Sequence, residues 1–144
     1  MNVPNLHNLM SYTNSKLIFR YNKDYPQAKL SAEEALNELM KFIWLCRLHH
    51  QDKQIHPQNE ALNFSCVIHE EMINIDQMWH SFLLYTRDYQ QFCSNYLQGY
   101  FFHHDPMEET KELSNEFYEQ ELELYLSYIH DNLGEDTLTK WFSS

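Results

Sequence analysis

Aspartate and histidine side chains gather in one stretch of the sequence, residues 73–106. Asp76 and His80 stand four residues apart near its start. In a helix this spacing places the carboxylate and the imidazole on the same face. A carboxylate combined with imidazoles suits zinc, iron or manganese. The candidate ligands of zinc or another divalent transition metal are Asp76, His80, His103 and His104.

A metal ion is not the only explanation of these polar residues. They stand among aromatic residues, and aspartate and histidine are costly to bury without a partner. The second interpretation is a buried Asp–His hydrogen bond that locks the helix against the His-His-Asp-Pro turn at 103–106. Because adjacent histidines usually point apart, we expect at most one of His103 and His104 to join the cluster.

Other residues that could take part in catalysis or metal binding carry weaker signals. Cys93 beside His80 or His103 has the residue types of a nucleophile and its base, but a cysteine on the apolar side of a helix is more often an inert core residue. The His-Glu-Glu run at 69–71 does not match the HExxH pattern of zinc proteases. With two glycines in the whole chain, a glycine-rich phosphate loop is not expected. The sequence therefore predicts no cofactor-binding motif and assigns no catalytic residue.

The composition predicts one globular helical domain over residues 1–144. The chain has 144 residues, 43% hydrophobic and 15% aromatic, which is enough to bury a core. The scarcity of glycine disfavours multi-hairpin folds. We therefore expect an all-α protein, a compact irregular bundle of about five to six helices.

Local signals place these helices. Ser31 and Glu34 form a capping box, and Asp105 followed by Pro106 is typical of a helix start. Gly99 and Gly134 are expected to end helices. Thr86 is expected to cap the helix that Gly99 ends. Helices are expected at residues 5–23, 31–49, 75–85, 86–98, 106–132 and 135–142, with an irregular loop at 50–72.

The net charge of −11 is concentrated near the C-terminus. Residues 105–136 hold eleven acids and the single base Lys111. Such a surface repels phosphate backbones, so nucleic acid is not an expected partner. The acidic helix 106–132 is either a solvated face or a docking surface for a basic protein.

The sequence also bears on location. The N-terminal residues lack a basic start followed by a long apolar run, so no signal peptide is expected. The longest apolar run, residues 42–46, is too short to span a bilayer. Three cysteines, an odd number without a CxxC pair, favour reduced thiols and a cytoplasmic location.

Two segments resemble the conserved core of a known family. They are DQMWHSFLLYTRDYQQFC (76–93) and GYFFHHDP (99–106), preceded by LSAEEALNELMKFIWL (30–45). Together they resemble the glycine-rich domain-containing protein-like family, in particular its small bacterial relatives, over residues 17–106. The relatives usually have a phenylalanine–glycine pair where this chain has Leu97-Gln98-Gly99, and the glycine-rich tail of the larger members is absent here.

The resemblance implies a helical fold with the Asp–Trp–His helix and the His-His segment at its site, but no particular reaction. The sequence therefore leaves two alternative functions open. The first is a non-enzymatic binding or protein-interaction module in which the Asp76/His80/His103/His104 cluster is structural or holds a metal. The second is a metal-dependent hydrolytic or oxidative enzyme that uses the same cluster.

Overall fold

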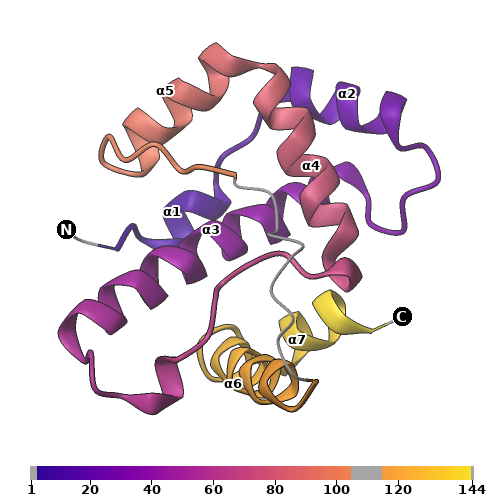
Figure 1. Cartoon of the computed structure of the whole chain (residues 1–144). Coiled ribbons are helices and arrows are strands. Elements are labelled where there is room, and N and C mark those ends of the chain that lie inside the picture. Colours follow the sequence, from indigo (N-terminus) through magenta and orange to yellow (C-terminus); the bar gives the residue numbers. More distant parts are fainter. Residues whose placement is uncertain (1–2, 105–114, 144) are drawn as a thin grey trace.

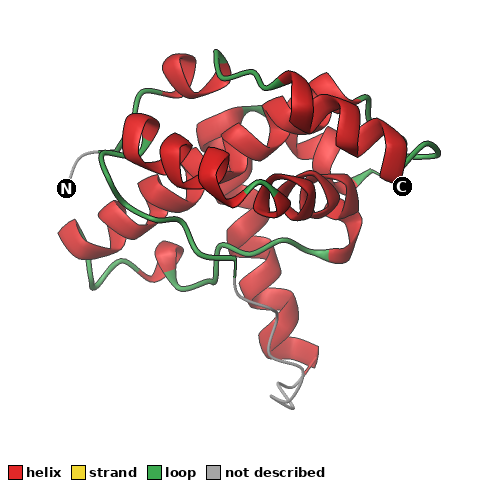
Figure 2. Cartoon of the chain, turned by 90° about the horizontal axis from the view of Figure 1, so that it is seen from above, coloured by secondary structure: helices red, strands yellow, loops and turns green. Residues whose placement is uncertain are grey.

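The computed structural model describes residues 3–104 and 115–143. Helix accounts for 72% of the described chain, and no strand is present in it, which confirms the all-α prediction. Figure 2 shows only helices and loops in this part of the protein. The α-helices are α1 (Leu6–Met10), α2 (Ser15–Asp24), α3 (Ala32–Ile55), α4 (Ile73–Leu84), α5 (Thr86–Tyr96), α6 (Asn115–Leu133) and α7 (Glu135–Phe142). Two 3₁₀ turns, η1 (Glu60–Leu62) and η2 (Glu70–Met72), lie between α3 and α4.

Helix α3 is the centre of the molecule. It packs against α1, α2, α4 and α6, with α2, α4 and α5 on one side of it and α6 and α7 on the other (Figure 1). Neighbours on several sides explain why residues all around this helix are buried, among them the consecutive pair Leu39 and Met40. The predicted capping box is present: the Glu34 amide donates to the Ser31 hydroxyl, and the Ser31 amide donates to the Glu34 carboxylate.

Three of the expected boundaries are wrong. Instead of one helix over 5–23 there are two, because the extended Asn14 accepts the amides of Lys16 and Leu17 and so caps α2. Helix α3 continues to Ile55 rather than ending near His49, so the predicted loop 50–72 begins inside a helix. Thr86 is the first residue of α5 and not its cap, since Tyr85 precedes the helix without a side-chain cap bond.

The C-terminal helices agree with the prediction where they are described. The expected start at Asp105-Pro106 lies outside the described residues, and α6 is described from Asn115 to Leu133. Gly134, with a φ of 92°, separates α6 from α7. Gly99, with a φ of 85°, follows α5 in the same way. None of the described helices combines the length and apolarity needed to cross a bilayer.

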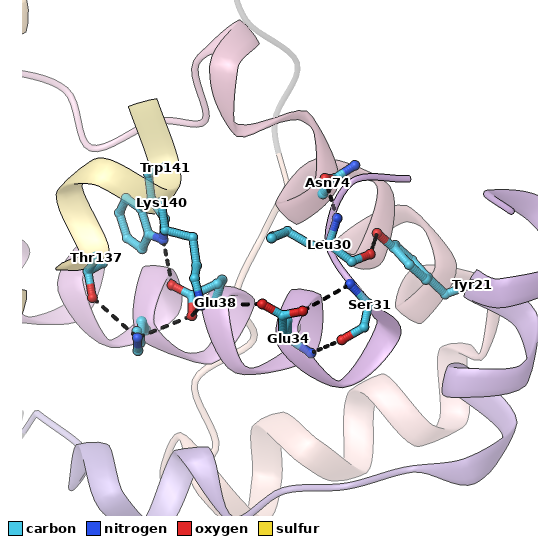
Figure 3. Close-up of polar contacts among 10 residues, drawn as sticks. Tyr21, Leu30, Ser31, Glu34, Glu38, Asn74, Thr137, Lys140 and Trp141 are labelled. Atoms are coloured by element: carbon cyan, nitrogen blue, oxygen red, sulfur yellow. Dashed lines mark hydrogen bonds and ion pairs between the residues drawn. The ribbon is translucent and has the colours of Figure 1, made fainter. Parts of the chain in front are cut away.

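Helix α7 is fastened to α3 around a buried carboxylate. Glu38 is 2% exposed and accepts a hydrogen bond from the Trp141 indole at 2.8 Å (Figure 3). Lys41 bridges Glu38 at 3.1 Å and the Thr137 hydroxyl at 3.2 Å. Lys140 adds an exposed ion pair to Glu34 at 3.4 Å. The charge of Glu38 is thus paired and hydrogen-bonded, as burial requires.

Candidate functional site

Helix α4 positions the first two residues of the cluster. Its apolar side, with Ile75, Trp79 and Phe82, is buried in the core beside α3. Trp79 is 4% exposed, which confirms that this face of the helix turns inward. Asp76 and His80 therefore stand together at the edge of the buried face, one helical turn apart.

The segment after α5 delivers the third residue. Gly99 turns the chain back toward α4, and Phe102 then stacks on the Trp79 indole with 5.1 Å between ring centroids. The Trp79 indole N–H donates to the Tyr89 hydroxyl at 3.1 Å, and that hydroxyl donates to the Phe102 carbonyl. These contacts hold the backbone just before His104 against α4.

Asp76, His80 and His104 form the cluster. His104 Nε2 lies 2.7 Å from Asp76 Oδ1, and His80 Nε2 lies 3.6 Å from Asp76 Oδ2. One candidate ligand atom from each residue lies within 4.8 Å of the other two. Because the carboxylate can only accept, the hydrogen on His104 is on Nε2, and this nitrogen donates to Asp76. Each carboxylate oxygen thus faces a different imidazole.

The two imidazoles differ in their surroundings. The His104 ring stacks on Trp79, with centroids 4.0 Å apart, and its side chain is 15% exposed. The His80 side chain is 53% exposed, and its ring lies 4.9 Å from that of His104 at an interplanar angle of 18°. His104 is therefore held in place by packing, whereas His80 can rotate toward solvent.

The charge state of Asp76 follows from these neighbours. The hydrogen bond from His104, followed by the nearby His80 ring, holds the pKa of the Asp76 carboxyl below its ordinary value, against the opposing effect of partial burial. Asp76 is therefore an anion at neutral pH. It can accept two hydrogen bonds or bind a cation.

His103 does not join the cluster. Its side chain is exposed, and its ring lies 4.9 Å from the Phe101 ring. Phe102 and His104 both stack on Trp79, whereas His103 contacts Phe101 instead, so only His104 faces Asp76. The four predicted ligands are reduced to three by this geometry.

Sequence reasoning missed two features. The first is the role of Tyr89 in holding the Phe102 carbonyl, which no local spacing indicates. The second is the contact between the thiols of Cys46 and Cys66, whose Sγ atoms lie 2.8 Å apart. Twenty residues separate these two cysteines, and no motif connects them. Cys93 is buried, as expected of a core residue.

A groove of about 760 Å³ lies elsewhere on the protein. It is lined by the turn 24–30, by residues 70–75 and by Lys140 and Trp141. Gln77 of α4 lines it too, but none of the three cluster residues is among the described residues that line the groove. The cluster therefore lies outside this groove.

Fold and site together define a class: an all-α protein with a partly buried Asp–His cluster held between a helix and an irregular segment. The chain belongs to the family described as UCP032817-like, whose sequence profile matches residues 8–128. This range includes Asp76, His80 and His104. No curated protein and no solved structure matches the chain. This match does not test the resemblance to the glycine-rich domain-containing protein-like family, which remains a prediction.

Proposed function

We propose that the protein is a non-enzymatic binding module whose cluster of Asp76, His80 and His104 takes up a divalent transition metal. Zinc is the best-suited ion, because it accepts mixed carboxylate and imidazole ligands without a strong geometric preference. The observation that carries the proposal is the Asp76 carboxylate, which faces one imidazole Nε2 with each of its oxygens.

The distances support this use of the cluster. Ligand atoms around tetrahedral zinc lie about 3.3 Å apart, given bonds of roughly 2.0–2.2 Å. The three candidate atoms already lie within 4.8 Å of one another. Zinc binding requires the 2.7 Å separation of His104 Nε2 and Asp76 Oδ1 to widen by about 0.6 Å and the exposed His80 ring to rotate toward the ion. Zinc takes the position of the hydrogen between His104 Nε2 and Asp76, and the neutral imidazole then carries its hydrogen on Nδ1.

A metal-dependent enzyme is the second candidate. Three protein ligands leave one position of a tetrahedral ion open, and the half-exposed His80 puts that position near solvent. The position of the cluster outside the groove favours the binding module, because a substrate needs a concave site beside the metal.

The acidic helix α6 is proposed as the surface for a protein partner. Residues 116–120 at its described start are exposed, and Figure 2 shows this end of the helix standing away from the other helices. Glu116 and Glu119 lie in this end, and a basic partner matches their charge.

The neighbouring residues His103, outside the cluster, and His104, within it, provide a matched control and test of the metal site. Untagged protein is stripped with a chelator, and zinc binding is measured by calorimetry and by the shift of the melting temperature. Zinc is expected to stabilise the wild type and His103→Ala, but neither His80→Ala nor His104→Ala. If zinc fails to shift the wild type, or shifts His104→Ala equally, the cluster is a hydrogen-bonded tie between α4 and the segment 101–104 and not a metal site.

A further inference from the structure

Two of the three thiols are in direct contact. Cys46 lies on α3, and Cys66 lies in the irregular segment 63–69 that crosses the side of that helix. Their Sγ atoms are 2.8 Å apart, and the Cys46 Sγ also lies 3.4 Å from the Cys66 carbonyl oxygen. A disulfide bond needs a separation of about 2.05 Å, so a shift of less than 1 Å brings the sulfur atoms to bonding distance.

The segment that holds Cys66 also carries the contacts of α6. The Tyr125 hydroxyl donates to the Val67 carbonyl at 2.8 Å, and the Ser65 amide donates to Glu121 at 2.7 Å. Phe64 stacks on Tyr125, with ring centroids 5.5 Å apart. Helix α6 therefore rests on this segment, and a bond from Cys66 to α3 fixes the surface on which α6 packs.

We propose that Cys46 and Cys66 form a reversible disulfide by exchange with a small-molecule disulfide such as oxidised glutathione. The Cys66 thiolate attacks the external disulfide, forms a mixed disulfide and releases one reduced thiol. The Cys46 thiolate then attacks the Cys66 sulfur and releases the second. Two protein thiols are oxidised and one external disulfide is reduced to two thiols, which take up the two protons. This site is independent of the metal cluster.

The surroundings of the two thiols do not indicate a metal site. Burial raises the pKa of the Cys46 thiol, so this sulfur rests as a thiol and loses its proton only when it attacks the mixed disulfide. Among the described residues, the only group of three metal-ligating side chains is the Asp76/His80/His104 cluster, which includes neither cysteine. Cys46 and Cys66 are both half-buried, and the raised pKa of Cys46 is expected to make the exchange slow.

Cys93 provides the internal control. It is buried near Tyr89 and the Phe102 backbone, in another part of the core. Oxidation is therefore expected to consume two thiols of the folded chain and to leave the third.

Thiol counting tests the proposal on the full-length protein. The protein is equilibrated with reduced or oxidised glutathione, denatured, alkylated and weighed by mass spectrometry. The reduced sample is expected to carry three alkyl groups. The oxidised sample is expected to carry one alkyl group, on Cys93, and to yield a peptide in which Cys46 and Cys66 are linked. Its melting temperature should be higher by roughly 5–10 °C, since the bond closes a loop of moderate length.

Two variants separate the outcomes. Cys93→Ser is expected to lose both thiols on oxidation, and Cys66→Ser is expected to form no internal link and to show no oxidation-dependent gain in melting temperature. Three alkylated thiols in the oxidised wild type, a glutathione adduct as the final product, a link that includes Cys93, or a link between two chains would each overturn the proposal.

Discussion

At the scale of single residues, Trp79 connects the core to the cluster. Its indole stacks on Phe102 and on His104, and its N–H donates to the Tyr89 hydroxyl. The same side chain thus fills the core beside α3 and holds the segment that carries His104. A buried aromatic side chain with a satisfied polar atom is hard to replace without loss.

Replacement of Trp79 tests this role. Trp79→Ala is expected to lower the free energy of unfolding by roughly 3–5 kcal/mol, because a large buried ring leaves a cavity. Trp79→Phe keeps much of the stacking but removes the hydrogen bond to Tyr89, so its cost should be smaller. Urea denaturation measures both, and a loss below about 1 kcal/mol for Trp79→Ala contradicts the assigned role.

Two buried histidines make stability depend on pH. Burial lowers the pKa of His49 and of His69. His49 Nε2 donates to the Leu62 carbonyl at 3.0 Å, and its ring stacks on Phe64. As the pH falls through the unfolded value of about 6.5, the unfolded chain binds protons that the folded sites exclude. Acidification in this window therefore favours unfolding.

The expected result is a stability that falls from pH 7.5 to pH 5.5, both values chosen to bracket the ordinary histidine pKa of about 6.5. His49→Gln and His69→Gln should each be less stable than the wild type at pH 7.5 but lose less on acidification. Urea titrations at three pH values give these slopes. Equal slopes in the wild type and in a variant that combines His49→Gln with His69→Gln would refute the prediction.

At the scale of elements, the docking of α7 on α3 depends on one buried charge. Glu38 accepts hydrogen bonds from the Trp141 indole N–H and the Lys41 ammonium, while Lys140 pairs with the exposed Glu34 at 3.4 Å and lies farther from Glu38, at 3.9 Å. A hydrogen bond to a buried carboxylate contributes more than an exposed ion pair, because its loss leaves the charge with less compensation. The two neighbouring contacts of α7 should therefore differ in their contribution to stability.

Variants of adjacent residues measure that difference. Trp141→Phe retains most of the ring but removes the indole donor, and it should cost about 1.5–3 kcal/mol. Lys140→Ala removes a partly exposed ammonium that pairs with Glu34 and, at 3.9 Å, with Glu38, and because solvent screens these pairs the change should cost less than about 1 kcal/mol. Chemical denaturation distinguishes the two. An equal cost for both would show that Glu38 gains little from the indole.

At the scale of the whole molecule, charge is the dominant surface property. The formal net charge is −11, and glutamates of α6 such as Glu116, Glu119 and Glu123 are exposed. Interactions of such exposed charges weaken as salt shortens the screening length to about 10 Å or less at 0.1 M. Binding of a basic partner at α6 should therefore be sensitive to salt.

A lysine-rich peptide followed by fluorescence anisotropy tests this property. Its affinity should fall several-fold as salt rises from about 50 to about 300 mM. Changing Glu116, Glu119 and Glu123 to lysine should abolish binding. Changing three exposed glutamates elsewhere, Glu33, Glu60 and Glu70, alters the net charge equally and should have a smaller effect. Equal losses in the two triple variants would assign the binding to net charge and not to α6.

Local signals in the sequence were sufficient for the fold class and for two of the three residues of the cluster. The Ser31 capping box and the turn at Gly134 depend on residues within a few positions of one another, so they could be predicted. The same holds for the pairing of Asp76 with His80, which needs only the period of a helix. The length of α3 was harder to predict, because residues 50–55 are exposed or half-buried and show no apolar periodicity, and the contact of Asp52 in this part with Tyr128 of α6 is long-range.

Only the tertiary structure decided which of His103 and His104 contacts Asp76 and which cysteines contact each other. Whether His103 or His104 turns inward depends on the register of the segment after α5, which Trp79 and Tyr89 set through Phe102. The contact of Cys46 with Cys66 depends on the path of the irregular segment across α3. Both are long-range contacts that only the packed core brings together, and no spacing along the chain encodes them.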